Sequence, residues 1–185
     1  MEFKMTEDKK VQLIHGGGGQ MQNELVHFIT KGITLRSVNN GVGIDAMDDG
    51  ATIPLPNYDQ EIVFSADGHI VDPLFFPGGN LGKLAACGTI NDIIMMGATP
   101  LALSSVMIIE EGMSFDSVGK IAEAFNLAAA TAKVAIITGD TKIMPRLALN
   151  GMIMSTSAVG IKSKNRKILD SNCQPGAKVI LTGTI

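Results

Sequence analysis

The chain has 185 residues, 45% of them hydrophobic, and a formal net charge of −3, so it can bury one substantial core and does not have the composition of a disordered protein. No run of lysine and arginine supplies the basic stripe that nucleic-acid binding needs, and aromatic residues, at 4%, are too few for a base-stacking surface. No apolar run reaches the roughly 18–20 residues that cross a bilayer, and the polar N-terminus lacks the apolar core of a signal peptide.

The first part of the chain predicts one helix, one long loop and one strand. Residues 1–10 form a charged lead-in, and Met21–Ile29 has a helical pattern. Residues 36–60 are rich in Asn, Gly, Asp and Pro, which predicts a long loop. Glu61–Ala66 is rich in Ile, Val and Phe, so we expect a strand that stops at Asp67.

The second part alternates helices and strands. Asn80 is a suitable N-cap for a helix over Leu81–Met96, with Gly97 just after its end. Another helix should begin after Ser114, because apolar residues then recur at helical spacing: Val118, Ile121, Ala122, Phe125, Ala129 and Ala132. Three further segments have the composition of strands: Leu101–Ile109, Val134–Thr138 and Gly151–Val159.

This order predicts an α/β or α+β domain in which a helical layer covers a sheet. Lys178–Thr182 predicts one more strand, which follows Pro175-Gly176 and has no evident partner. We therefore expect a main domain over residues 11–170. Residues 171–185 should be a linker and the first strand of a truncated second domain.

Aspartates gather where loops and strands are predicted to end: Asp45, Asp48, Asp49, Asp67, Asp72 and Asp140, with Asp92 inside a helix. Mg²⁺ prefers a few carboxylate oxygens together with phosphate oxygens, so aspartates converging from separate segments would suit a magnesium–nucleotide site. For any single aspartate, capping a turn is the simpler explanation. That explanation is weakest for Asp92, because aspartate is a poor helix former, and for Asp140, which precedes Thr141-Lys142 after a predicted buried strand.

Two glycine-rich segments suggest anion binding. The loop His15-Gly16-Gly17-Gly18-Gly19 could cradle a phosphate because its bare N–H groups can approach an anion closely, although a flexible linker has the same composition. Gly78–Lys83 imitates a Walker A loop but lacks the first glycine and the Ser/Thr after the lysine. The residues alone therefore predict a soluble α/β domain with, at most, a magnesium–nucleotide site.

Several strings, in order, resemble the signature of the HypE family of hydrogenase maturation proteins. They are Asp67–Pro100, Ile109–Gly112, Ile137–Lys142 and the glycine loop at 15–19. The likeness runs from about Leu13 to Ile185. More loosely, it places the chain in the superfamily of aminoimidazole ribonucleotide synthetase, selenophosphate synthetase and thiamine-monophosphate kinase.

The resemblance implies an α+β N-terminal domain, with a mixed sheet covered by helices, that binds ATP and Mg²⁺. It also implies a homodimer in which strands of both subunits close a barrel near the nucleotide. The implied metal positions are Asp49, Asp67, Asp92 and Asp140, with Asp48 assisting. The implied nucleotide contacts are Gly16, Gly17, Gly18, Gly19, Asn91, Thr141 and Lys142, and the implied catalytic residues are Lys142 and Asp140.

HypE-like proteins dehydrate a thiocarbamate carried on their own C-terminal cysteine. ATP phosphorylates the amide oxygen, and loss of phosphate and a proton leaves a thiocyanate, whose cyanide becomes an iron ligand of nickel–iron hydrogenase. A HypF-like carbamoyltransferase and HypC/HypD-like proteins are the implied partners, in the cytoplasm. Cys87 and Cys173 match no metal or disulfide motif and neither is expected to carry the carbamoyl group, so we expect this chain alone not to turn over.

One local departure and three alternatives accompany this interpretation. Ser65-Ala66-Asp67 stands where relatives commonly have threonine before the aspartate. A phosphoryl transferase of the selenophosphate or thiamine-phosphate type is the first alternative, although no cysteine precedes Cys87 as selenophosphate synthetases usually require. A non-catalytic maturation scaffold is the second, and an α/β domain with acidic turns is the third.

Overall fold

The computed structural model describes residues 10–181 and residue 183. The chain divides into two compact units, one ending at Arg36 and the other beginning at Ser37. The first unit contains a 3-10 helix, Leu13–Gly16, followed by helix α1, Gly19–Thr30. Helix α1 confirms the helix predicted over Met21–Ile29.

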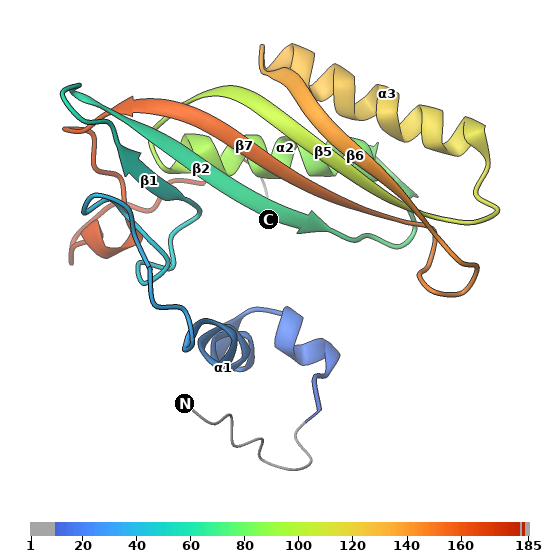
Figure 1. Ribbon diagram of the computed structural model, residues 1–185, viewed down its shortest axis with the longest axis horizontal. Helices are drawn as coiled ribbons and strands as arrows, with labels where there is room; N and C mark the ends of the chain where they lie inside the picture. The colour runs from blue at the N-terminus through green and yellow to red at the C-terminus, as the bar shows by residue number, and fades with distance from the viewer. Residues whose placement is uncertain (1–9, 182, 184–185) are drawn as a thin grey trace. The chain divides into compact units, whose positions relative to one another are not determined.

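The second unit is built on a five-stranded mixed sheet (Figure 1). In spatial order its strands are β1 (Ala51–Pro54), β2 (Gln60–His69), β7 (Met152–Ser163), β5 (Thr99–Glu110) and β6 (Ala135–Met144). Strand β7 is antiparallel to both of its neighbours, whereas β5 and β6 are parallel. Strands β3 (Phe75–Phe76) and β4 (Gly79–Asn80) form a separate hairpin. The predicted mixed sheet is therefore confirmed.

Helices α2 (Leu81–Met95) and α3 (Phe115–Thr131) lie on the same face of this sheet (Figure 1). The Asn80 side chain accepts a hydrogen bond from the N–H of Lys83 at 3.1 Å, which caps α2 as predicted. Gly97, just past its end, has a φ of +77° that favours glycine. Ser114 caps α3 in the same way, since its Oγ accepts from the N–H of Ser117. Local capping chemistry thus defines three of the four ends of α2 and α3.

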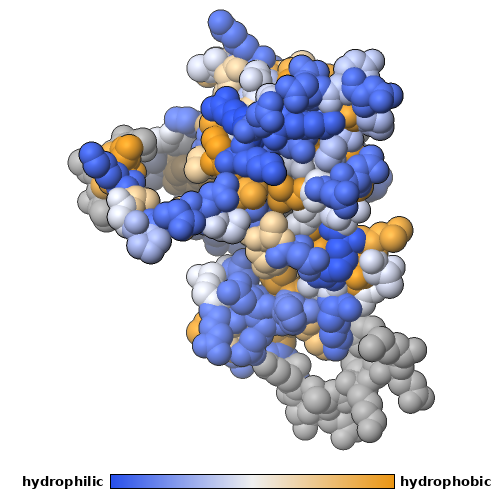
Figure 2. All heavy atoms as spheres, turned by 90° about the vertical axis from the view of Figure 1, so that its left-hand side faces the viewer, coloured by the Kyte–Doolittle hydropathy of each residue, from blue (hydrophilic) through white to orange (hydrophobic). Residues whose placement is uncertain are grey.

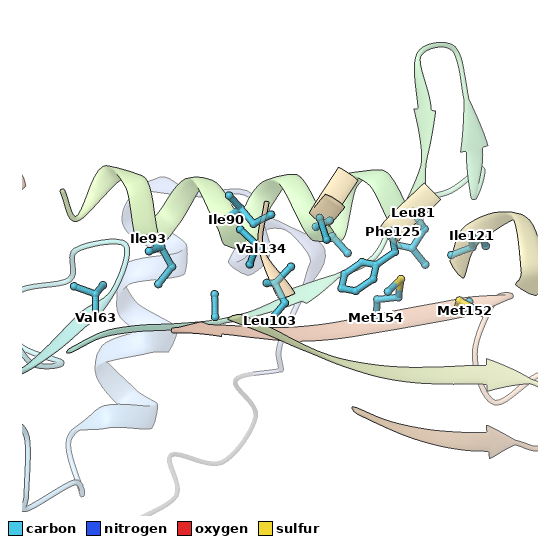
Figure 3. Packing of buried hydrophobic residues seen from close by; sticks show 14 of the residues in the cluster. Val63, Leu81, Ile90, Ile93, Leu103, Ile121, Phe125, Val134, Met152 and Met154 are labelled. Atoms are coloured by element: carbon cyan, nitrogen blue, oxygen red, sulfur yellow. The ribbon is translucent and has the colours of Figure 1, made fainter. Parts of the chain in front are cut away.

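The hydrophobic core lies between the two helices and the sheet (Figure 3). Its members include Val63, Leu103, Met152 and Met154 from the strands, Leu81, Ile90 and Ile93 from α2, and Ile121 and Phe125 from α3. Glycines allow the closest approaches. A Cβ on Gly82 would overlap the carbonyl oxygen of Ile121, and one on Gly160 would overlap Cγ2 of Ile93. The packing of α2 against α3 and against β7 therefore depends on these two positions.

Three strand predictions were wrong in their bounds or surroundings. Strand β1 lies inside the predicted 36–60 loop, because Ala51–Pro54 pairs with β2 and this tertiary contact outweighs local composition. Strand β2 continues through Asp67 to His69, so Asp67 lies within a strand and not after one. Strand β6 likewise runs through Gly139-Asp140, and as an edge strand it is exposed along its length, not buried.

The chain ends also differ from the expectation. Of the strand predicted over Lys178–Thr182, residues 178–181 form no strand, because none of the sheet strands pairs with them. Thr182 and residues 1–9 of the predicted lead-in lie outside the described residues.

Hydrophilic side chains predominate on the side drawn in Figure 2, where hydrophobic ones form small groups. None of the helices in the described part of the chain is long and apolar enough to cross a membrane.

Candidate functional site

Two aspartates face each other between β2 and α2. In strand β2 every second side chain faces helix α2, namely those of residues 63, 65, 67 and 69. Thr89 and Asp92 lie on one face of α2 because they are three residues apart. Ser65 Oγ donates a hydrogen bond to Asp92 Oδ2 at 2.8 Å. Thr89 Oγ1 donates one to Asp67 Oδ2, also at 2.8 Å. Each carboxylate is thus tied to the element opposite its own.

Asp49 lies close enough to Asp67 and Asp92 for their negative charges to repel one another. Burial is the main cause that raises the pKa of Asp92 to about 6, and the negative charges of Asp67 and Asp49 add to it against the hydrogen bond from Ser65. Partial burial also raises the pKa of Asp49, followed by repulsion from Asp170, Asp48 and Asp67. Carboxylates that repel one another in this way form a donor set that a cation would stabilise.

Asp48 and Asp170 lie beside this group. Asp48 Oδ1 accepts a hydrogen bond from the N–H of Asp170 at 2.9 Å. Asp170 begins a short 3-10 helix, Asp170–Asn172, so Asp48 anchors the segment that follows β7 next to Asp49. The sequence analysis did not single out Asp170, which nonetheless contributes negative charge to the cluster.

The arrangement fits Mg²⁺ held jointly with a nucleotide. Within residues 10–181 and 183, no three His, Cys, Asp or Glu side chains are grouped closely enough to hold a metal ion by themselves. Mg²⁺ bound with nucleotides is commonly held by one or two carboxylates together with phosphate oxygens and water. Asp67 and Asp92, with Asp49 nearby, match that type of donor set.

Asp140 and Lys142 are paired with each other on the edge strand β6. Lys142 Nζ and Asp140 Oδ2 are 2.7 Å apart, and the two side chains are 64% and 52% exposed. The hydrogen bond from Lys142 is the main cause that lowers the pKa of Asp140, and the N–H of Thr141, 2.8 Å from Asp140 Oδ1, lowers it further. The ionised form of the Asp140 side chain is therefore favoured by its neighbours.

Strand register separates this pair from the aspartates near α2. Asp67 is level with Thr156, whose side chain is buried on the helix-covered face. Asp140 aligns through Val106 and Ser155 with Gly68, one row further along β2, so it belongs to the opposite face. Three strand spacings separate β6 from β2, about 14 Å in all. The structure thus brings Asp49, Asp67 and Asp92 together and leaves Asp140 and Lys142 apart from them within one chain.

The predicted glycine loop lies in the first unit. Gly18 and Gly19 have φ angles of +84° and +68°, which favour glycine, and the N–H of Gly18 donates to Gln22 Oε1 at 2.7 Å. Gly16 to Gly19 are all exposed, as are Asn91 next to Asp92 and Thr141 on β6.

A buried polar group behind Asp67 was not predicted from the sequence. His69 Nε2 lies 3.2 Å from Thr89 Oγ1 and 3.1 Å from Thr156 Oγ1. Burial lowers the pKa of His69, although the charge of Asp67 opposes this effect. The available signal was the spacing: His69 is two residues from Asp67 on one strand face, and Thr89 is three residues from Asp92 on one helix face.

Comparison with known proteins identifies the family. Residues 47–162 match the family described as AIR synthase related protein, N-terminal domain. The chain belongs to this family. The AIR synthase related domain therefore includes the three clustered aspartates and the whole sheet except the last residue of β7.

Two curated relatives of this AIR synthase related domain cover nearly the whole chain. A putative hydrogenase expression/formation protein of Methanocaldococcus jannaschii is 45% identical over 177 residues, which are 95% of this chain and 52% of the relative. Carbamoyl dehydratase HypE of Rhizobium leguminosarum is 39% identical over 176 residues, or 95% and 48%. The chain thus spans about half the length of the curated relatives it matches, and the predicted resemblance to HypE is confirmed.

Solved HypE structures share this domain. A chain of the solved HypE-HypF complex superposes with a TM-score of 0.70 at 35% identity, covering 85% of this chain and 47% of that one. The hydrogenase maturation protein HypE in complex with ATP superposes with a TM-score of 0.54 at 35% identity, covering 88% and 44%.

Proposed function

We propose that this chain is the ATP-binding domain of a HypE-like carbamoyl dehydratase that acts in hydrogenase maturation. The names of its relatives and the similarity to HypE solved with ATP support this function. The observation that carries it is the convergence of Asp49, Asp67 and Asp92 from a loop, a strand and a helix. In this proposal the three aspartates hold Mg²⁺ together with the phosphates of ATP.

The remaining candidate residues have proposed roles in the same reaction. Bound Mg²⁺ supplies charge neutralisation at the transferring phosphoryl group. Gly16 to Gly19 are proposed to cover the triphosphate with their N–H groups, while Asn91 and Thr141 contact the nucleotide. Lys142, oriented by Asp140, would stabilise charge that develops as the amide oxygen of a thiocarbamate is phosphorylated. Loss of phosphate and a proton then leaves a thiocyanate.

A homodimer is part of the proposal. Both helices of the second unit cover one face of the sheet (Figure 1), and Phe64 on the opposite face is 41% exposed. Strand β6 has a neighbour on one side only. Pairing of two such sheets into a barrel would cover the face that carries Asp140 and Lys142, and we propose that these two residues act at that interface.

The protein partners and the cellular location of this chain are proposed by analogy with HypE proteins. A HypF-like carbamoyltransferase is the first proposed partner, since the HypE of the solved HypE-HypF complex is 35% identical to this chain. HypC/HypD-like proteins would receive the cyanide in the cytoplasm. Cys87 is half-buried in α2 and Cys173 is exposed after the 3-10 helix, and we propose neither as the carbamoyl carrier. The chain alone is then expected to bind ATP without forming thiocyanate.

Isothermal titration calorimetry with Mg·ATP tests the nucleotide site. Wild type should bind in a Mg²⁺-dependent manner, and Asp92→Asn should weaken binding at least about tenfold, because loss of a carboxylate ligand removes a charge-assisted contact. Asp116→Asn is the matched control, since Asp116 is exposed on α3 and forms an ion pair with Lys120 of the same helix.

Either of two results would count against the proposal. Binding of ATP that does not depend on Mg²⁺ would contradict the role of the aspartates, and equal weakening by Asp92→Asn and Asp116→Asn would show a general charge effect. The dehydration step is tested separately with a protein that contains this domain and a carbamoylated cysteine. Mass spectrometry should then show ATP-dependent loss of one water.

A further inference from the structure

The polar group behind Asp67 is buried and joins three secondary-structure elements. Thr89 and Thr156 are 0% and 1% exposed, and the His69 side chain is 11% exposed. Thr89 comes from α2, Thr156 from β7 and His69 from β2. Only Asp67, at 30%, reaches the surface to a larger extent. The group therefore connects the interior to one carboxylate of the candidate site.

The number of available protons fixes which atom donates in each hydrogen bond of this group. An ionised carboxylate accepts only, so the single hydroxyl proton of Thr89 goes to Asp67 Oδ2, 2.8 Å away. The contact between the Thr89 and Thr156 hydroxyls, 2.5 Å long, then needs the proton of Thr156. With both hydroxyl protons used, His69 Nε2 can only donate. The chain of donors runs from His69 through Thr156 and Thr89 to Asp67.

Packing keeps the imidazole in place. A Cβ on Gly88 would lie 2.9 Å from Cε1 of His69, so the ring fills the space that this glycine leaves on α2. The Oγ of Ser155 donates to the backbone carbonyl of Asp67 at 3.0 Å. The side chain of Asp67 is thus bonded on the helix-covered face and its backbone carbonyl by a residue of the neighbouring strand β7.

From this geometry we propose that His69, Thr156 and Thr89 are positioning residues, which fix the carboxylate of Asp67 in the orientation that binds the metal–nucleotide complex. The inference rests on the proposed function. Hydrogen-bond partners behind a metal ligand restrict its orientation, and their loss commonly lowers metal affinity by about 10–100-fold. Thr89 is the decisive member of the three because its hydroxyl donates a hydrogen bond to the carboxylate at 2.8 Å, whereas His69 Nε2 lies 3.8 Å from the same oxygen.

The test compares Mg·ATP affinities of the whole 185-residue chain and matched variants by calorimetry. Thr89→Val keeps the shape but removes the hydroxyl, and its dissociation constant should rise about 10–100-fold. Thr89→Ser restores the hydroxyl and should stay within about threefold of wild type. Thr131→Val is the control, because its hydroxyl bonds only within α3, to the carbonyl of Leu127. Thermal melting of each variant separates loss of affinity from loss of fold.

A second measurement needs no variant. The ¹⁵N chemical shifts of the His69 imidazole should show a proton on Nε2, because the chain of donors starts there. A neutral ring protonated on Nδ1 alone would overturn the inference. So would a Thr89→Val variant that binds like wild type, or a Thr89→Ser variant as weak as Thr89→Val, while Asp67→Asn still loses binding. Absence of binding by wild type would instead overturn the proposed function, and the inference with it.

Discussion

Ser65 on β2 donates its hydroxyl hydrogen bond to Asp92 on α2, with 2.8 Å between Oγ and Oδ2. A hydroxyl contact to this carboxylate is therefore supplied by serine. The bond stabilises the charged form of a carboxylate whose pKa is nevertheless raised to about 6, mainly by burial.

Removal of that hydroxyl should raise the pKa of Asp92 further. In Ser65→Ala the carboxylate loses a hydrogen bond that favours ionisation, while burial and the nearby charge of Asp67 remain. A ¹³C NMR titration of labelled aspartate side chains measures this directly. In Ser163→Ala, which loses a hydrogen bond to Asp59, the titration of Asp92 should match wild type. An unchanged or lower pKa of Asp92 in Ser65→Ala would contradict the assigned role.

Asp92 should also make the folding stability depend on pH. An aspartate side chain ordinarily has a pKa of 3.8, whereas the pKa of Asp92 in the folded protein is about 6, so the folded state binds the proton more tightly. This contribution to stability is present below the unfolded pKa and is lost as the pH rises through about 6. Full conversion of the shift gives about 3 kcal/mol, which solvent screening of a half-exposed group reduces to about 1 kcal/mol.

Asp92→Asn removes that pH dependence. Urea denaturation should show that the variant gains about 1 kcal/mol over wild type between about pH 4 and about pH 7.5. Asp116→Asn, on an exposed helix surface, should show no such gain. A constant difference between Asp92→Asn and wild type across this range would contradict the predicted linkage.

Glu110 should hold the loop between β6 and β7. Its Oε1 accepts the N–H of Leu147 at 2.7 Å and its Oε2 accepts the N–H of Gly151 at 3.0 Å, and these two bonds are the main causes that lower the pKa of Glu110. In Glu110→Ala, amide hydrogen exchange at Leu147 and Gly151 should accelerate. Glu111→Gln is the matched control, and equal exchange in both variants would show that the loop is held by other contacts.

Two glycines in helices should respond in opposite ways to the same substitution. Gly82→Ala should destabilise the fold by about 1–3 kcal/mol, because the added Cβ overlaps the backbone carbonyl of Ile121. Gly119→Ala, on the exposed side of α3 with no heavy atom within 4 Å of the added Cβ, should stabilise it by about 0.5–1 kcal/mol. Chemical denaturation of both variants gives the comparison, and similar effects would refute the close-packing interpretation.

Features set by neighbouring residues could be predicted from the sequence. The start of α2 follows from Asn80 and the start of α3 from Ser114, because a cap needs only a side chain and an amide two or three residues away. Strand β1 could not be predicted, since its four residues gain their structure from pairing with β2. The exposure of β6 depends on strand order, which local sequence does not encode.

The candidate site shows the same division. Residue chemistry alone suggested a magnesium–nucleotide site but left every aspartate open to a turn-capping role. The resemblance selected Asp49, Asp67, Asp92 and Asp140, and within one chain the first three lie together while Asp140 lies apart. The face occupied by Asp140 depends on one irregularity: the register between β5 and β6 shifts after Leu103, so that Ile137 is an extra residue on β6. Such an insertion reverses the face of every later side chain, and no local pattern predicts it.

The central position of β7 determines when the sheet can form during synthesis of the chain. Its two neighbours, β2 and β5, are complete long before β7 leaves the ribosome, yet they share no ladder with each other. Until residues 152–163 emerge, both strands present unpaired backbone groups to the cell. The five-stranded sheet can therefore form only after residues 152–163 have been synthesised, because β7 is the strand that joins β2 to β5.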